Sequence, residues 1–367
     1  METMAPEDGK QRRYREDIAK GLSRVFDAKG TDTLDVELDG LRWIVMSDHH
    51  KGARDGADDF RRCERVYNAA LASYLEEGYT LAALGDAEEL WECSPSEVLD
   101  AYRHTLELEA EFHGQGRYER FWGNHDDAWR HAADVKKHLQ RAGFPGLRVR
   151  EALKVRVNRG GAALGSLFLV HGHQGTAESD RFGWFSRLVV RHVWRPLQRK
   201  LDVPSTTPAR DWALRARHEA AMFAWARGRP EHPVLIAGHT HRPVFGASMP
   251  EPKTARSADD IRRELEALRA SPPVDTERAA ALRAELEFVI AEQRRVERPI
   301  PIEPPCFFNT GCCSFGDGDI TGIELADGEI RLVRWSASEG APSRRVLAHD
   351  SLAHTFARVA GGVATPS

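Results

Sequence analysis

The stretch LRWIVMSDHH (residues 41–50) joins a continuous apolar run to side chains that can bind metal. The run at 41–47 has the length and apolar character of a buried β-strand. Asp48 and His50 follow it directly, so we expect them in the loop at the end of that strand. In α/β proteins such loops carry the chemistry, because a rigid sheet holds several of them at one edge.

Four later parts of the chain repeat this arrangement of an apolar run followed by a polar motif. They are TLAALG (80–85) before Asp86, YERFWGN (118–124) ending at Asn124 before His125 and Asp126, LFLVHG (167–172) around His171, and PVLIAGH (233–239) leading to His239 and His241. The motifs combine carboxylate and amide oxygens with imidazole nitrogens, which suits Mn, Fe, Zn or Co better than Ca or Mg. We therefore predict a metal site where the five loops meet.

The residues of these motifs supply ligands for two adjacent divalent metals, and Asp86 is our choice for the bridging carboxylate. Cations about 3.5–4 Å apart make a water between them hydroxide-like near neutral pH. We expect that hydroxide to attack phosphorus in line, while both metals neutralise charge on the phosphoryl oxygens. The predicted activity is hydrolysis of a phosphate ester.

In this order the motifs resemble those of the calcineurin-like metallophosphoesterases, whose pattern is D-x-H, G-D, G-N-H-D/E, a later His and G-H-x-H. The resemblance covers residues 41–248 and 306–335, including FNTGCCSF at 308–315. It implies two metal sites, one made by Asp48, His50, Asp86 and His241 and the other by Asp86, Asn124, His171 and His239. It also implies Mn²⁺ as the first choice of metal, with Fe, Zn, Co or Ni as alternatives.

The same resemblance implies a role for the two residues after Asn124. His125 would protonate the leaving-group oxygen as general acid, and Asp126 would orient the other ring nitrogen of that histidine. We expect Glu88 and Glu89 to open a helix after the GD motif, where acidic side chains suit the positive helix end.

Each motif also has a simpler interpretation. Ser47-Asp48 could cap a turn, and GNHD alone is typical of a β-turn. His173 is an alternative ligand to His171, whereas we expect His49 on the surface or supporting a ligand rather than on the metal. The order of all five motifs favours the metal site.

The pattern between the motifs predicts an α/β fold, an α+β sandwich of two mixed β-sheets flanked by helices, which is also the fold that the resemblance implies. Apolar residues at helical spacing predict helices at about 59–77, 96–113 and 128–142. Hairpins are expected at 152–170, around Asn158-Arg-Gly-Gly, and at 320–335, around Asp327-Gly328.

The same sequence patterns predict the domain organisation. We expect an N-terminal helical extension at 1–30, the catalytic domain at 31–250 and 301–350, and a flexible tail at 355–367. A helical cap is expected at 176–231, and a charged helical hairpin at 251–300. The seam of that hairpin is predicted to contain Leu265, Leu268, Leu282, Leu286 and Ile290.

Composition indicates a soluble cytoplasmic protein. Of its 367 residues, 41% are hydrophobic and 29% are charged, and the net charge of −4 argues against general nucleic-acid affinity. No apolar run reaches the ~20 residues of a membrane helix, and the first residues lack the apolar core of a signal peptide. The five cysteines have no C-x-x-C spacing and are expected to be reduced.

Two segments suggest partners. Aromatic and arginine residues alternate through 181–201, which could contact a lipid or a membrane surface, and 251–300 could mediate self-association or bind a protein. The motifs also resemble the UDP-2,3-diacylglucosamine hydrolase branch, which would make the protein a pyrophosphatase for a lipid-linked substrate. That branch has Arg in place of His125 and HGD in place of HGH, so we favour a general phosphoesterase. A non-catalytic scaffold and a nuclease are the remaining alternatives.

Overall fold

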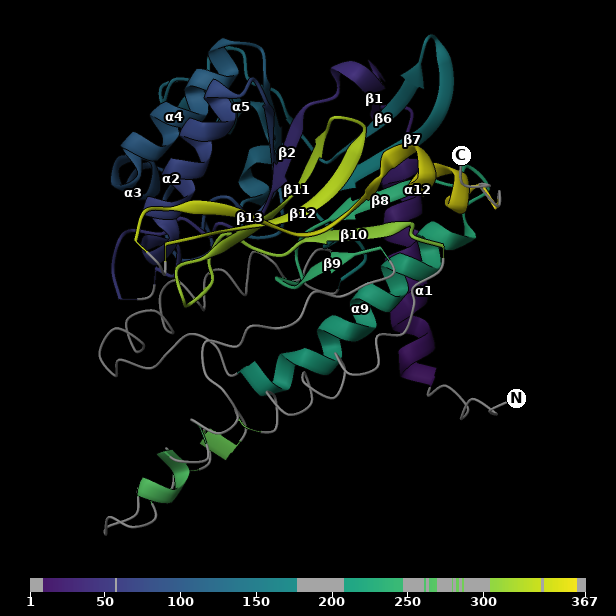
Figure 1. The fold of residues 1–367 in the computed structure, drawn as a ribbon. Helices are drawn as coiled ribbons and strands as arrows, with labels where there is room; N and C mark the ends of the chain where they lie inside the picture. The colour runs from purple at the N-terminus through teal and green to yellow at the C-terminus, as the bar shows by residue number, and fades with distance from the viewer. Residues whose placement is uncertain are drawn as a thin grey trace.

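The computed structural model describes residues 9–56, 58–176, 208–246, 304–337 and 340–361, with single residues and short pieces of 261–286. Two mixed β-sheets pack face to face, and helices flank both of them (Figure 1). This confirms the predicted α/β sandwich at the level of its layers.

The six-stranded sheet has the order β1 (Asp32–Glu37), β6 (Ala152–Arg159), β7 (Ala162–Val170), β8 (Val234–Ala237), β10 (Phe307–Thr310), β9 (Pro243–Phe245). The seven-stranded sheet has the order β13 (Ser343–Ser351), β12 (Glu329–Ser336), β11 (Ile320–Ala326), β2 (Trp43–Met46), β3 (Thr80–Leu84), β4 (Tyr118–Phe121), β5 (Val149–Arg150). The outer strands β1 and β13 were not predicted, because their exposed residues weaken the apolar pattern.

Strand β2 shows how both faces of the seven-stranded sheet are covered. Along β2, Trp43 and Val45 belong to the core between the sheets, whereas Ile44 and Met46 belong to the core under the neighbouring helices. Successive side chains of a strand point to opposite faces, and here both faces are covered. The strand is therefore apolar at every position.

Helix α2 (Phe60–Glu76) covers the outer face of the seven-stranded sheet and agrees with the prediction for 59–77. Its buried residues are the seven that the helical spacing indicates: Phe60, Cys63, Val66, Tyr67, Ala70, Leu71 and Tyr74. The apolar spacing alone was enough to define which face of this helix is buried.

The two following helices are shorter than predicted. The 96–113 segment is divided into α3 (Pro95–Ala101) and α4 (Arg103–Gly114), because Tyr102 leaves the helical region at φ −114° and ψ 31°. Its buried hydroxyl donates to Asp58 Oδ2 at 2.7 Å. The 128–142 segment contains a 3-10 turn, η2 (Asp127–Arg130), and α5 (Ala132–His138).

Both predicted hairpins are present. Gly160 and Gly161 connect β6 to β7 with φ 58° and 80°, and Asp327 and Gly328 connect β11 to β12 with φ 56° and 76°. Two consecutive positive φ values define the tight turn whose twist matches that of antiparallel strands. The turn residues therefore determine the antiparallel pairing of β6 with β7 and of β11 with β12.

Residues 208–228, predicted as part of a cap, instead form a core helix, α9 (Pro208–Gly228). Strands β7 and β8 are parallel neighbours, and a parallel pair requires a long crossover connection. Met222 and Ala226 bury one side of α9 in the core. Residues 177–207, which include the 181–201 segment, lie outside the described residues.

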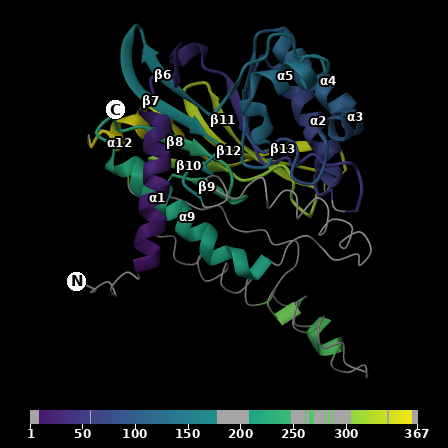
Figure 2. The ribbon, with the colours of Figure 1, turned by 180° about the vertical axis from the view of Figure 1, so that it is seen from behind.

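The two ends of the described chain are also part of the core. In α1 (Gly9–Phe26), Ile18 and Leu22 are fully buried, and Figure 2 shows α1 beside α9 on the six-stranded sheet. The tail predicted to be flexible from residue 355 begins in a helix, α12 (Leu352–Val359). Phe356 of that helix packs against Gly165 of β7, and this contact holds the helix on the six-stranded sheet.

Three smaller predictions can be compared with the structure. All five cysteines are buried and none of them forms a disulfide. Leu265 and Leu282 share a small buried cluster with Ile261 and Ala279, as expected for the seam of the helical hairpin, whereas Ile290 lies outside the described residues. Among the helices described, none has the length and apolar character needed to cross a membrane.

Candidate metal centre

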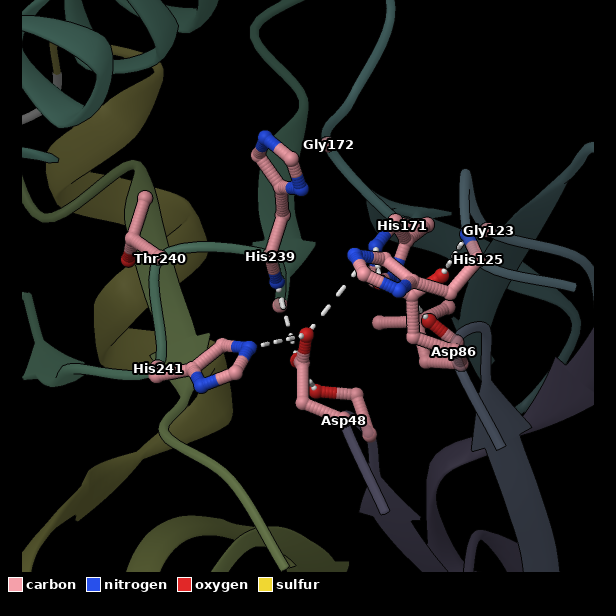
Figure 3. A network of polar contacts seen from close by, with 12 residues as sticks. Asp48, Asp86, Gly123, His125, His171, Gly172, His239, Thr240 and His241 are labelled. Atoms are coloured by element: carbon pink, nitrogen blue, oxygen red, sulfur yellow. Dashed lines mark hydrogen bonds and ion pairs between the residues drawn. The ribbon is translucent and has the colours of Figure 1, made fainter. Parts of the chain in front are cut away.

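The motif loops meet at the carboxyl ends of the central strands. Strands β2, β3 and β4 are parallel neighbours, and so are β7 and β8, so their following loops lie at common edges of the two sheets. Figure 3 shows Asp48 near the middle, with contacts to His241, to His171 and to the backbone of His239. The predicted convergence of these loops is confirmed.

Three groups of side chains in the described chain could hold a metal ion, each with ligand atoms within 4.8 Å of one another. The groups are Asp48, His50 and His241; His50, Asp86 and His125; and Asp86, His171 and His239. The first contains three of the four predicted ligands of one metal, and the last contains three of the four predicted for the other. Asp86 and His50 each belong to two groups, so the groups form one continuous site.

The backbone at the ligands is unusual. Of the eight non-glycine residues with positive φ in the described chain, five are predicted ligands: Asp48, His50, Asp86, His239 and His241. A non-glycine residue held in such a conformation costs about 1–3 kcal/mol, and such residues cluster at functional sites. The fold therefore concentrates backbone strain in the loops that carry the ligands.

Two motif glycines are required by close approach. A Cβ at Gly123 would overlap Asp86 Oδ1, and a Cβ at Gly238 would overlap Ser47 Oγ. The missing side chain lets each loop approach a carboxylate loop from another strand. This explains why GNHD and GHTH both begin with glycine.

Unpaired buried atoms point to a cation. Three atoms of predicted ligands, Asp48 Oδ1, Asn124 Oδ1 and His171 Nε2, are among the fourteen buried side-chain atoms of the described chain that have no hydrogen-bond partner. His171 Nδ1 donates to Leu84 O at 2.8 Å, so the neutral ring turns the lone pair of Nε2 toward Asp86 Oδ2 at 3.1 Å. Two acceptors at that distance need a proton or a cation. The residues therefore fit a metal.

The pKa shifts of the histidine and the two carboxyls agree with this geometry. Burial alone would lower the pKa of His171, but the carboxylates of Asp86 and Asp48 raise that pKa to about 9. Burial would raise the pKa of both carboxyls, but neighbouring histidines hold the pKa of Asp48 and of Asp86 below the ordinary value. A proton on His171 thus occupies the place where a cation would compensate the two carboxylates.

Sequence reasoning misassigned Glu89, which does not open a helix. Its Oε2 lies 2.7 Å from His125 Nδ1 and 3.1 Å from His50 Nδ1. Burial opposes ionisation, but His125 and His50 lower the pKa of Glu89 to about 2. An acidic loop and an acidic first helical turn have the same composition, so the sequence could not separate them. Its position three residues after Asp86 was the one sequence feature that could have placed Glu89 in the site.

Asp126 has a different role from the predicted one. Its Oδ1 accepts from Gly123 N at 2.6 Å, and its Oδ2 accepts from Ala87 N at 2.9 Å. Its carboxylate therefore joins the loops after β3 and β4, and the carboxylate of Glu89 is the one that lies at Nδ1 of His125. A carboxylate one residue after a histidine is directed to a different side of the loop.

Trp91 is a second residue that the sequence did not indicate. Its indole stacks on the His125 ring, with centroids 4.2 Å apart and planes at 18°, and its Nε1 donates to Asn124 O at 2.6 Å. It therefore holds both the predicted general acid and the backbone of a predicted ligand.

The remaining motif histidines are not members of the three ligand groups. His173 belongs to none of the three groups found in the described chain, although its ring centroid is 5.4 Å from that of His171. His49, expected on the surface or behind a ligand, is fully buried against the ring of Tyr67. His171 is thus the better placed of the two HGH histidines.

A buried ionic network supports the loops from below. Glu109 accepts from Lys51 Nζ at 2.5 Å and from Arg120 at 3.4 Å, and Arg120 also pairs with Glu88. All four side chains are at most 1% exposed. Lys51 directly follows the DHH motif, so the network fastens that loop to α4 and β4.

No protein-family model matches the chain, and no curated protein matches it significantly. The chemistry of the site therefore rests on its own side chains. Carboxylates and imidazoles gathered this closely, with unpaired buried acceptors, are suited to binding cations.

Proposed function

We propose that the chain is a binuclear metal-dependent phosphoesterase of the calcineurin-like type. The observation that carries this proposal is the set of three adjoining ligand groups that share Asp86 and His50. Asp86 of the third group lies 3.9 Å from His50 Nε2 of the first, the place where a carboxylate could bridge two neighbouring cations. The order of the motifs along the chain supports the same assignment.

The donor set suggests how two cations would be divided. Asp48, His50, Asp86 and His241 would hold one, and Asp86, Asn124, His171 and His239 the other. When bound, the cations would supply Lewis acidity, both for activating water and for neutralising charge on the phosphoryl oxygens. The mixed oxygen and nitrogen ligands favour Mn²⁺ or another transition metal over Mg²⁺.

His125 is suited to the role of general acid. Glu89 lies 2.7 Å from Nδ1, so His125 would meet the substrate with its other nitrogen, Nε2. As the bond between phosphorus and the leaving oxygen breaks, His125 gives the Nε2 proton to that oxygen, and water supplies the new oxygen on phosphorus. Glu89 keeps the ring oriented, and Trp91 holds one of its faces by stacking.

The proposal is tested by metal content and by hydrolysis together. The Mn²⁺-loaded protein should hydrolyse bis-p-nitrophenyl phosphate or p-nitrophenyl phosphate, and the ratio of kcat/KM separates a diesterase from a monoesterase. Asp86→Asn removes the shared charge and should lose both bound metal and turnover.

Two outcomes would change the assignment. A wild-type protein that binds no divalent metal would refute the proposal. A metal-loaded protein that is inactive on both nitrophenyl esters but cleaves a pyrophosphate would instead support the lipid-pyrophosphatase alternative.

A further inference from the structure

Two helices outside the sequence motifs reach the loops that carry the histidine ligands. In α9, His218 and Glu219 are consecutive and both buried. His218 Nε2 donates to Gly172 O at 2.6 Å, and Glu219 accepts from Thr240 Oγ1 at 2.9 Å. Gly172 follows His171, and Thr240 lies between His239 and His241. One turn of α9 therefore holds both loops.

The contact of His218 with Gly172 determines its tautomer. A carbonyl oxygen can only accept, so Nε2 carries the hydrogen, and the neutral ring has Nδ1 free to accept. Tyr14 of α1 lies on that side, with its hydroxyl 2.9 Å from Nδ1, and must therefore donate. The ring centroid of His218 is also 5.0 Å from that of His239. His218 thus contacts α1 and both histidine loops.

The backbone of α1 lies directly against the loop after His171. A Cβ at Gly21 would be 2.5 Å from Gly175 N, and a Cβ at Gly175 would be 2.7 Å from Ile18 Cα. No side chain separates the helix from the loop at this point. The position of the HGH loop therefore depends on α1 as well as on β7.

We propose that His218, held by Tyr14, is a positioning residue that fixes the HGH and GHTH loops for the cation bound by His171 and His239. This inference rests on the proposed function. The two ligands come from different loops, and His218 contacts one loop at Gly172 O and the other at the ring of His239. Without its hydrogen bond and its ring contact, the loops lose a common support, and the cation between them should bind more weakly.

The experiment compares His218→Phe and Tyr14→Phe with the wild-type full-length chain. His218→Phe keeps an aromatic ring but removes both hydrogen bonds, and Tyr14→Phe removes only the hydroxyl. Co²⁺ is titrated into metal-free protein, and its visible absorption reports both the affinity and the ligand geometry of each bound ion. A melting curve of each metal-free variant reports folding separately.

Trp225→Phe is the matched control. Trp225 lies in the same helix, and its Nε1 donates to Ser23 Oγ of α1 at 2.9 Å, but among the residues that the structure describes no hydrogen bond links it to the HGH or GHTH loop. This variant should lower the melting temperature without changing Co²⁺ affinity. His218→Phe should weaken one of the two Co²⁺ ions by about 10–100-fold, the usual effect of removing a residue that orients metal ligands.

Two further comparisons make the result decisive. His218→Gln, whose amide can still donate to Gly172 O, should recover part of the affinity. Tyr14→Phe should weaken the same ion, and should cause no additional loss in the His218→Phe background, because the tyrosine acts through the histidine. Additive losses would overturn that link.

The failure of this inference can be separated from that of the proposed function. Wild-type protein that binds Co²⁺ while His218→Phe binds it equally well, with only a lower melting temperature, would overturn the positioning role alone. Wild-type protein that binds no Co²⁺ would overturn both.

Discussion

Oε2 of Glu89 lies 2.7 Å from Nδ1 of His125. The same oxygen is 3.1 Å from Nδ1 of His50, so one carboxylate contacts both the proposed general acid and a proposed metal ligand. Because Nδ1 of each ring faces Glu89, each presents Nε2 to the centre of the site. A hydrogen on Nδ1 of His50 leaves the lone pair of Nε2 for a metal, whereas His125 acts as an acid in the form that is protonated on both nitrogens, which the carboxylate of Glu89 favours.

Glu89→Gln should impair both functions at once. A glutamine keeps one acceptor oxygen but carries no charge, so it no longer provides the negative charge that faces both histidine rings. We expect Mn²⁺ affinity to fall by about 10-fold or more, and kcat to fall at saturating metal. Calorimetric titration and steady-state kinetics measure the two effects. Glu97→Gln, which alters the capping box of α3, is the control and should change neither. An unchanged kcat in metal-saturated Glu89→Gln would contradict this role.

His125→Gln should retain its metal and lose turnover. Removing a positioned acid slows hydrolysis by about 10²–10⁴-fold when the leaving group needs a proton. A nitrophenolate leaves without one, so the loss should be much smaller for nitrophenyl esters than for alkyl esters. Comparing kcat for the two ester classes in wild type and variant tests this. Equal losses for both classes would remove His125 from the role of acid.

Gly238→Ala should disturb the metal site through its backbone. The new Cβ would overlap Ser47 Oγ and lie 2.5 Å from Asp48 Oδ2, so the GHTH loop must move away from Asp48. We expect weaker Mn²⁺ binding in a folded protein, measured by metal analysis after gel filtration. Gly40→Ala is the matched control, since nothing lies within 4 Å of its new Cβ. Equal metal content in the two variants would show that this close approach is not required.

Glu109→Gln should destabilise the protein and reduce its sensitivity to acid. Burial alone would raise the pKa of Glu109, but Lys51 and Arg120 lower that pKa to about 2, below the value of about 4.3 expected in an unfolded chain. Its stabilising contribution is therefore complete above about pH 5 and is lost as the pH falls toward 2.

Urea denaturation at pH 7 and pH 3 measures both effects. At pH 7 the variant should lose about 3–5 kcal/mol, because Lys51 and Arg120 remain buried with less negative charge nearby. The difference from wild type should be smaller at pH 3. Glu16→Gln, which breaks an exposed pair with Arg12, should cost less than about 1 kcal/mol. A loss for Glu109→Gln as small as this would contradict the importance of the network.

The apolar patterns predicted most of the architecture. The spacing within 59–77 identified every buried residue of α2, and Gly160-Gly161 and Asp327-Gly328 located two hairpins. These signals are local, since a helix face or a two-residue turn is determined by a few neighbouring side chains. The break at Tyr102 was not predictable, because it depends on a hydrogen bond to Asp58, which is distant in sequence.

The candidate ligand residues that the structure brings together were also recognisable from the sequence, but the residues that support them were not. The composition around Glu89 suits a first helical turn as well as a loop, and that around His218 suits an ordinary core helix. Only the fold brings these two side chains to the motif histidines and their loops. Asp126 was assigned to the wrong partner for the same reason, since adjacency in the chain does not determine the direction of a side chain in a loop.

The sequence by itself determined which residues form the apolar strands and which polar side chains follow them, because burial and turn chemistry act over short distances. The tertiary structure decided how those side chains are oriented. The orientation of His125 by Glu89, the support of two loops by α9, and the close contact of α1 with Gly175 all join segments that are distant in the chain. Such contacts depend on how the sheets and helices pack, which no local pattern specifies.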